Sequence, residues 1–161
     1  EVYAEKKMFA TLDPTSRRLR LPYEQEIIIN DTVGFIRDLP EDLVAAFRAT
    51  LEEIADSDLL LHIVDASNPR SLMQIEAVEK ILSDLKLNEI PRLVVLNKSD
   101  LLDESDIEAL KRHLSLDRQV ESVAVSAIKR ESLKPLLESV GEIIAKDLVY
   151  SVSASEMQFS N

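Results

Sequence analysis

The chain has 161 residues, a formal net charge of −11 and no cysteine. This length suits one domain with a sizeable core, and the lack of cysteine excludes disulfides and thiolate metal sites. No signal peptide is present, and no apolar run approaches the ~20 residues that a membrane span requires, so we expect a cytoplasmic protein without a membrane span. The acidic balance argues against direct DNA binding, which depends largely on Lys and Arg neutralising phosphates.

Strand and helix patterns alternate along the chain. Residues 18–23 and the apolar run 27–29 predict a β-hairpin whose second strand is short and buried. Apolar runs at 59–64, 93–96 and 120–125 predict further strands, and helices are expected from Pro40 and at 71–85, 105–114 and 132–146. This alternation predicts an α/β fold, a mainly parallel sheet with helices on both faces. We expect one domain over residues 1–148, followed at 149–161 by a polar tail or the start of a C-terminal extension.

The run Leu93–Leu96 ends in Asn97-Lys98-Ser99-Asp100, a pattern typical of a guanine-binding loop. The Asp100 carboxylate can accept hydrogen bonds from N1–H and from the exocyclic amine of guanine, a donor pair that adenine lacks. Asn97 would tie the loop to its neighbours, and the stem of Lys98 would cover one face of the base. The alternative interpretation is a solvated turn, in which these residue types are common.

A second pattern, Asp31-Thr32-Val33-Gly34, follows the apolar run 27–29. Asp31 could hold Mg²⁺ through water, because this ion dehydrates reluctantly. Gly34 would let its backbone N–H approach a terminal phosphate without a Cβ in the way. Thr32 and Val33 complete this predicted nucleotide-binding turn, which could alternatively do no more than close a strand.

Ser126-Ala127 follows the strand predicted at 120–125. In guanine-nucleotide proteins a Ser-Ala turn of this kind offers a backbone N–H to the guanine O6. The three patterns each follow a strand, and ligands of open α/β sheets bind at the carboxyl ends of the strands. We therefore expect the three loops to form one nucleotide site.

Longer segments extend the comparison to a known family. The segments 9–15, 31–40 and 43–53 closely resemble the GTPase domain of the HflX family. The similarity is continuous from about Val2 to about Asp103 and is looser, but still ordered, to about Ala145. It implies a Ras-like P-loop NTPase G domain that binds GTP and GDP and hydrolyses GTP, in a ribosome-associated protein that binds the large subunit and splits ribosomes.

The resemblance also implies roles for individual residues. Thr11 is similar to the switch threonine that coordinates Mg²⁺ together with Asp31, and Thr15 is the alternative. Asp65 corresponds to a structural position outside the nucleotide site. Phe35 stands where many GTPases have the Gln that orients the attacking water, so we expect slow unaided hydrolysis and assign no catalytic residue in this chain.

The phosphate cradle of such proteins, Gly-x-x-x-x-Gly-Lys-Ser/Thr, needs two glycines five positions apart. The chain contains only Gly34 and Gly141, so no cradle can be formed from it. By the resemblance, the first strand, the cradle and most of the first helix would precede the matched region, and losing that central strand would open two strand edges. We expect a part of a longer protein or, alternatively, a chain that pairs with another.

Two functions follow from these patterns. The first is a GTPase domain that, as this chain alone, binds nucleotide weakly or not at all and is inactive. The alternative is a nucleotide-independent protein- or ribosome-binding module. A preceding segment that carries the phosphate cradle would favour the first function.

Overall fold

The computed structural model describes residues 15–22, 25–31 and 54–158, and the side chains of the last helix as far as Lys146. The chain divides into two compact units, Glu1–Ser57 and Asp58–Asn161. Each unit is described by itself.

The first unit contains a β-hairpin, as the sequence predicted. Strands β1 (Thr15–Arg20) and β2 (Glu26–Asp31) pair antiparallel, with Thr15 opposite Asp31 and Arg20 opposite Glu26. The expectation that β2 is buried is wrong, because Ile28 and Ile29 are 65% and 37% exposed. Within the described residues β2 pairs only with β1, and a two-stranded ribbon cannot cover both of its own faces.

The second unit is a parallel three-stranded sheet in the order β3-β4-β5. The strands are β3 (Leu60–Asp65), β4 (Arg92–Asn97) and β5 (Glu121–Ala124). Parallel neighbours require crossover connections, which here are α3 (Ser71–Asp84) and, after the short 3₁₀ helix η2 (Ser99–Leu101), α4 (Glu104–Arg118). After β5 come η3 (Arg130–Leu133) and α5 (Lys134–Gln158). The predicted parallel sheet is confirmed.

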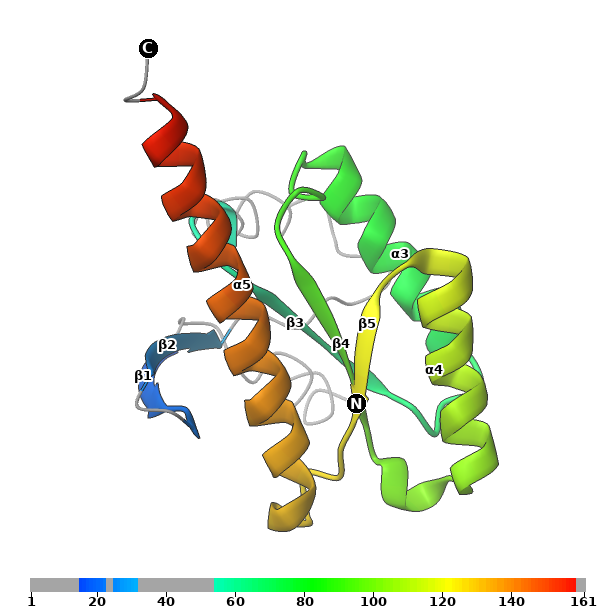
Figure 1. Ribbon diagram of the computed structural model, residues 1–161. Helices are drawn as coiled ribbons and strands as arrows, with labels where there is room; N and C mark the ends of the chain where they lie inside the picture. The colour runs from blue at the N-terminus through cyan, green and yellow to red at the C-terminus, as the bar shows by residue number, and fades with distance from the viewer. Residues whose placement is uncertain (1–14, 23–24, 32–53, 159–161) are drawn as a thin grey trace. The chain divides into compact units, whose positions relative to one another are not determined.

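Helices cover both faces of this sheet (Figure 1). Side chains alternate between the faces of a strand, and all four residues from Leu93 to Leu96 in β4 are buried. Val94 and Leu96 pack in one cluster with Ile75 of α3 and Leu114 of α4. The alternate residues Leu93 and Val95 point to the opposite face, where α5 packs against β5. This burial on both sides makes β4 the centre of the unit.

Strand β3 is an edge strand in the described part of the chain, with β4 on one side only. Ile63 is paired in register with Val95 but is 57% exposed, whereas Val95 is buried. In the described part of the chain, α5 packs mainly against β5, and β3 has no strand on its other side. An open edge beside β3 is what the sequence predicted for a sheet without its central strand.

Helix boundaries differ from the prediction. The helix expected at 105–114 is α4, which begins at Glu104 after the extended N-cap residue Asp103 and continues to Arg118. The last helix does not end near Lys146 but continues to Gln158. Residues 142–158 contain neither Gly nor Pro, and serine alone does not terminate a helix. The domain boundary predicted at residue 148 therefore falls inside α5.

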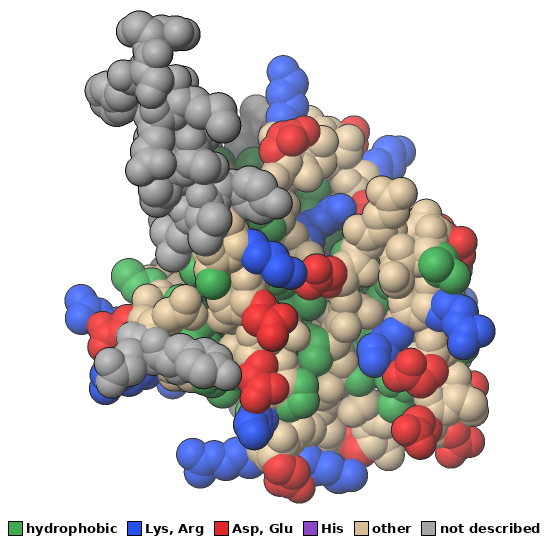
Figure 2. Space-filling model, viewed as in Figure 1, with side chains coloured by type: hydrophobic (Ala, Val, Ile, Leu, Met, Phe, Trp, Pro, Cys, Tyr) green, Lys and Arg blue, Asp and Glu red, His purple; other side chains and the backbone are tan. Residues whose placement is uncertain are grey.

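Surface charge on the second unit is mixed in sign. Figure 2 shows acidic and basic side chains interspersed over α3 and α4, with no continuous basic field among the described residues in view. None of the helices that the structure describes is both long enough and apolar enough to cross a membrane.

Candidate functional site

The carboxyl ends of β3, β4 and β5 bring three sequence-distant segments together. Asp65 lies opposite Asn97 in the β3–β4 register, and Leu96 lies opposite Ala124 in the β4–β5 register. Beyond the strands, Ser99 N donates to Val125 O at 3.1 Å, which keeps the loops after β4 and β5 side by side. Two of the three predicted loops, those at 97–100 and 126–127, therefore meet at one edge of the sheet.

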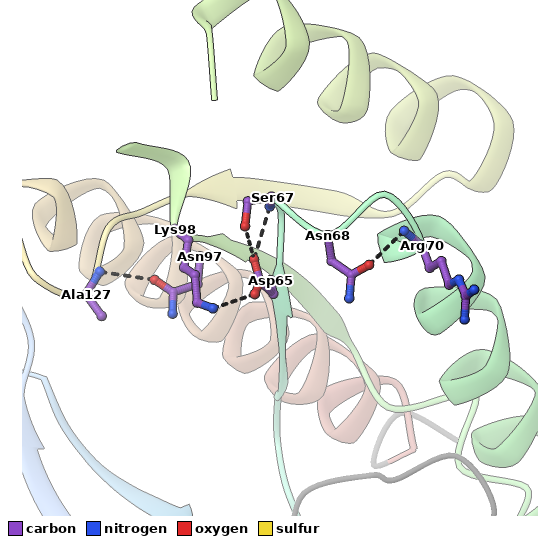
Figure 3. A network of polar contacts seen from close by, with 7 residues as sticks. All are labelled: Asp65, Ser67, Asn68, Arg70, Asn97, Lys98 and Ala127. Atoms are coloured by element: carbon purple, nitrogen blue, oxygen red, sulfur yellow. Dashed lines mark hydrogen bonds and ion pairs between the residues drawn. The ribbon is translucent and has the colours of Figure 1, made fainter. Parts of the chain in front are cut away.

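Asn97 connects all three strands. Its side-chain Oδ1 accepts a hydrogen bond from Ala127 N at 3.1 Å, and its carbonyl oxygen accepts from Ala66 N at 2.9 Å. The Asn97 side chain therefore holds the loop after β5 (Figure 3), and its backbone carbonyl holds the end of β3. This is the bracing that the sequence predicted for Asn97.

Asp100 is oriented by a buried hydroxyl. Ser126 Oγ donates to Asp100 Oδ1 at 2.5 Å, and Ser126 is 1% exposed whereas Asp100 is exposed. The hydrogen bond from Ser126, helped by the positive charge of Lys129, keeps the pKa of Asp100 below its ordinary value. The loop thus presents an ionised acceptor, in a fixed orientation, to solvent.

Ser126 is itself fixed by the start of the following helix. Ser132 Oγ accepts from Ser126 N at 2.9 Å and lies 2.8 Å from Ser126 O and 2.7 Å from Lys129 O. Lys129 N also donates to Ser126 O at 2.8 Å. These contacts close a turn in which Ser132 holds Ser126 in place. Ser132 was not among the site residues predicted from the sequence.

Lys98 adopts a left-handed backbone conformation, with φ 60° and ψ 32°. Its Nζ lies 2.5 Å from Asp65 Oδ2, and 53% of the lysine side chain is exposed. Ser67 donates to the other oxygen, Asp65 Oδ1, from Oγ at 2.6 Å and from N at 3.1 Å (Figure 3). The resemblance implied a structural position for Asp65 outside the nucleotide site, and the structure shows that its carboxylate contacts Lys98 of the Asn97–Asp100 loop.

The remaining predicted residues belong to the first unit, which is described by itself. Asp31 lies at the end of β2 in the first unit, whereas Thr11, Thr32, Val33 and Gly34 lie outside the described residues. Among the residues that the structure describes, no group of three or more His, Asp or Glu gathers as a metal site. Asp31 is an exposed carboxylate, the donor type that Mg²⁺ prefers, so it fits the ion as one of the two predicted ligands.

Comparison with known proteins decides the family. A family model described as "50S ribosome-binding GTPase" matches residues 1–98, more than half of the chain. The chain belongs to this family. Its β4 and the first residues of the Asn97–Asp100 loop lie within the match.

Relatives within this GTPase family carry the name GTPase HflX. The domain is 50% identical over 141 residues to GTPase HflX of Caldanaerobacter subterraneus subsp. tengcongensis, covering 83% of the chain and 32% of the relative. It is 52% identical over 103 residues to GTPase HflX of Escherichia coli strain K12, covering 64% of the chain and 24% of the relative. The predicted resemblance to HflX is confirmed, and the chain spans about a third or less of the length of these relatives.

A solved structure shares the fold. The crystal structure titled "SsGBP and GDP complex" aligns with a TM-score of 0.70 and 26% identity, covering 88% of this chain and 45% of that one. The α/β fold of a P-loop GTPase predicted from the sequence is therefore confirmed.

Proposed function

We propose that this chain is the guanine-reading and switch-bearing part of a GTP-binding and GTP-hydrolysing domain in an HflX-like, ribosome-associated GTPase. The observation that carries the proposal is the pair Asp100 and Ser126, in which a buried hydroxyl orients an ionised, exposed carboxylate. Guanine offers two adjacent N–H donors to such an acceptor, and adenine would leave it without them.

The other nucleotide contacts follow from the same edge of the sheet. Asn97 Oδ1 holds the loop after β5 by accepting from Ala127 N, and on nucleotide binding this N–H would turn to the guanine O6. The exposed stem of Lys98 would cover one face of the base. These assignments for Asn97, Lys98, Asp100, Ser126 and Ala127 rest on the contacts among them.

The phosphates would be held elsewhere. Asp31, Thr32, Val33 and Gly34 would contribute to the terminal phosphate, and Thr11 with Asp31 would hold Mg²⁺, which stabilises the charge that develops on the phosphoryl oxygens. The two glycines of the chain cannot form the phosphate cradle, so other residues of the working GTPase must supply it. We place this GTPase in the cytoplasm, on the large ribosomal subunit.

Competition binding tests the proposal. A fluorescent GDP analogue with Mg²⁺ is titrated with the full-length gene product, and unlabelled GDP and ADP are used as competitors. We expect displacement by GDP and not by ADP. Equal displacement by both nucleotides would contradict the proposed guanine site.

One substitution sharpens the test. Asp100→Asn places an NH₂ donor against the donors of guanine, so we expect at least about tenfold weaker binding of GDP. The same variant should gain relative affinity for xanthosine diphosphate, whose C2 carbonyl can accept from the new amide. Asp103→Asn, an exposed aspartate three residues further on at the N-cap of α4, is the matched control and should bind GDP as the wild type does. Unchanged GDP affinity in Asp100→Asn would refute the role of this carboxylate.

A further inference from the structure

Asp65 and Lys98 are 33 residues apart in the sequence but adjacent in space. The parallel register that places Asp65 opposite Asn97 brings the Asp65 carboxylate beside the residue that follows Asn97. Lys98 Nζ then lies 2.5 Å from Asp65 Oδ2 (Figure 3). A contact of this length is a charge-assisted hydrogen bond, which is stronger than one between neutral groups.

The Asp65 carboxylate cannot turn freely. While Lys98 contacts Oδ2, the hydroxyl and the backbone N–H of Ser67 both donate to Oδ1. Hydrogen bonds from Lys98 and from Ser67 lower the pKa of Asp65, so the group is ionised at neutral pH. The acceptor for the lysine is therefore fixed in both position and charge.

Lys98 is fixed at both ends. Its left-handed backbone lies between two hydrogen-bonded neighbours, since Asn97 O accepts from Ala66 N and Ser99 N donates to Val125 O. A non-glycine residue in this conformation is strained and persists only where its surroundings enforce it. With the backbone held and the ammonium bound to Asp65, the four-carbon stem is constrained at both ends while half of the side chain stays exposed.

We propose that Asp65 is a positioning residue of the guanine site, which holds Lys98 so that its stem is ordered before the base arrives. This inference rests on the proposed function. Asp65 itself does not touch the nucleotide. A lysine that is free before binding loses side-chain entropy when the base binds. If Asp65 orders the stem beforehand, part of this loss no longer opposes binding.

A double-mutant cycle in the full-length gene product tests this role. The variants are Asp65→Asn, Lys98→Met and the two combined, and the measurement is the dissociation constant of the fluorescent GDP analogue with Mg²⁺. Methionine retains an apolar stem of similar length but cannot bind Asp65. We therefore expect each single variant to weaken GDP binding about 3- to 10-fold, and the double variant to be no weaker than Lys98→Met.

Non-additivity separates positioning from a general structural role. If the Asp65→Asn effect persists in full on the Lys98→Met background, Asp65 does not act through Lys98 and the proposal is overturned. The same conclusion follows if Asp65→Asn leaves GDP affinity unchanged. Asp117→Asn is the matched control, because it removes an aspartate paired with His113 at 2.5 Å on α4 and should not change GDP affinity.

Two further readouts keep the test decisive. Asp65→Glu keeps the charge and moves it by one methylene. We expect it to restore at least half of the binding free energy that Asp65→Asn loses or, if Asp65→Asn does not fold, to bind GDP within about threefold of the wild type. Failure of both Asp65 variants to fold would overturn the proposal in favour of a structural role. The wild type shows separately whether the proposed function holds, because its preference for GDP over ADP does not depend on either variant.

Discussion

The pH dependence of stability should reveal the neutral state of His62, on β3. Burial and the nearby Arg92 guanidinium lower the pKa of this histidine from 6.5 to about 4, although Glu79 offsets part of the effect. Between these two values the unfolded chain binds a proton at His62 that the folded chain does not. The contribution of neutral His62 to the free energy of unfolding is therefore fully present above pH 6.5 and is lost as the pH decreases toward 4.

The size of the loss follows from the interval between the two values. For a folded pKa of about 4 and an unfolded pKa of 6.5, the free energy of unfolding should fall by about 2 kcal/mol between pH 7.5 and pH 5. Urea unfolding followed by circular dichroism at both pH values measures it. Carboxylates also titrate in this range, so the informative quantity is the difference between the wild type and His62→Gln.

His62→Gln should remove most of this pH-dependent loss, because glutamine has no proton to gain. The matched control is His113→Gln, which removes the only other histidine of the chain and leaves His62 in place. It should retain the wild-type loss between pH 7.5 and pH 5. Identical pH dependence in the wild type and in His62→Gln would refute the reasoning.

Two further substitutions test the supports around the sheet. Ser132→Ala leaves the buried Ser126 N–H without its acceptor, so we expect it to lower the free energy of unfolding by about 1–3 kcal/mol and to speed GDP release. Unchanged values in urea unfolding and in stopped-flow measurements of GDP release would contradict this. Arg118→Ala removes a half-buried guanidinium that contacts two glutamates of α3, and should destabilise by about 1–2 kcal/mol. Lys111→Ala, which breaks an exposed pair on α4, should cost less than about 0.5 kcal/mol, and equal losses for the two variants would count against the Arg118 network.

Much of the site's geometry could be predicted because its local patterns are strong. The apolar run before Asn97 predicted a strand, and the structure buries all four of its residues. The parallel alternation then placed the loops after β4 and β5 at one edge, where Asn97 contacts Ala127 and Asp100 contacts Ser126. The two loops meet because their strands are parallel neighbours, and the alternation of strands and helices in the sequence had predicted parallel strands.

Other features were outside what sequence patterns carry. The contact between Asp65 and Lys98 depends on the register of two strands, which no single segment of sequence specifies. The helix expected from Ser105 begins instead at Glu104, because Asp103 and Ser105 are both suitable N-cap residues and the extended backbone lies at Asp103. The exposure of Ile28 could not be predicted either, because a β-branched run fits a buried strand and an uncovered hairpin equally well.

The contacts at the end of the parallel sheet have a consequence for biosynthesis. They join residues 26, 30 and 33 positions apart, and they exist only after β3, β4 and β5 have all paired. Parallel strands assemble late, since loop closure must precede every long-range contact. During translation these contacts therefore cannot form until residues beyond Ser132 have been made. Under the proposed function, a chain would gain its guanine site only when this sheet is complete.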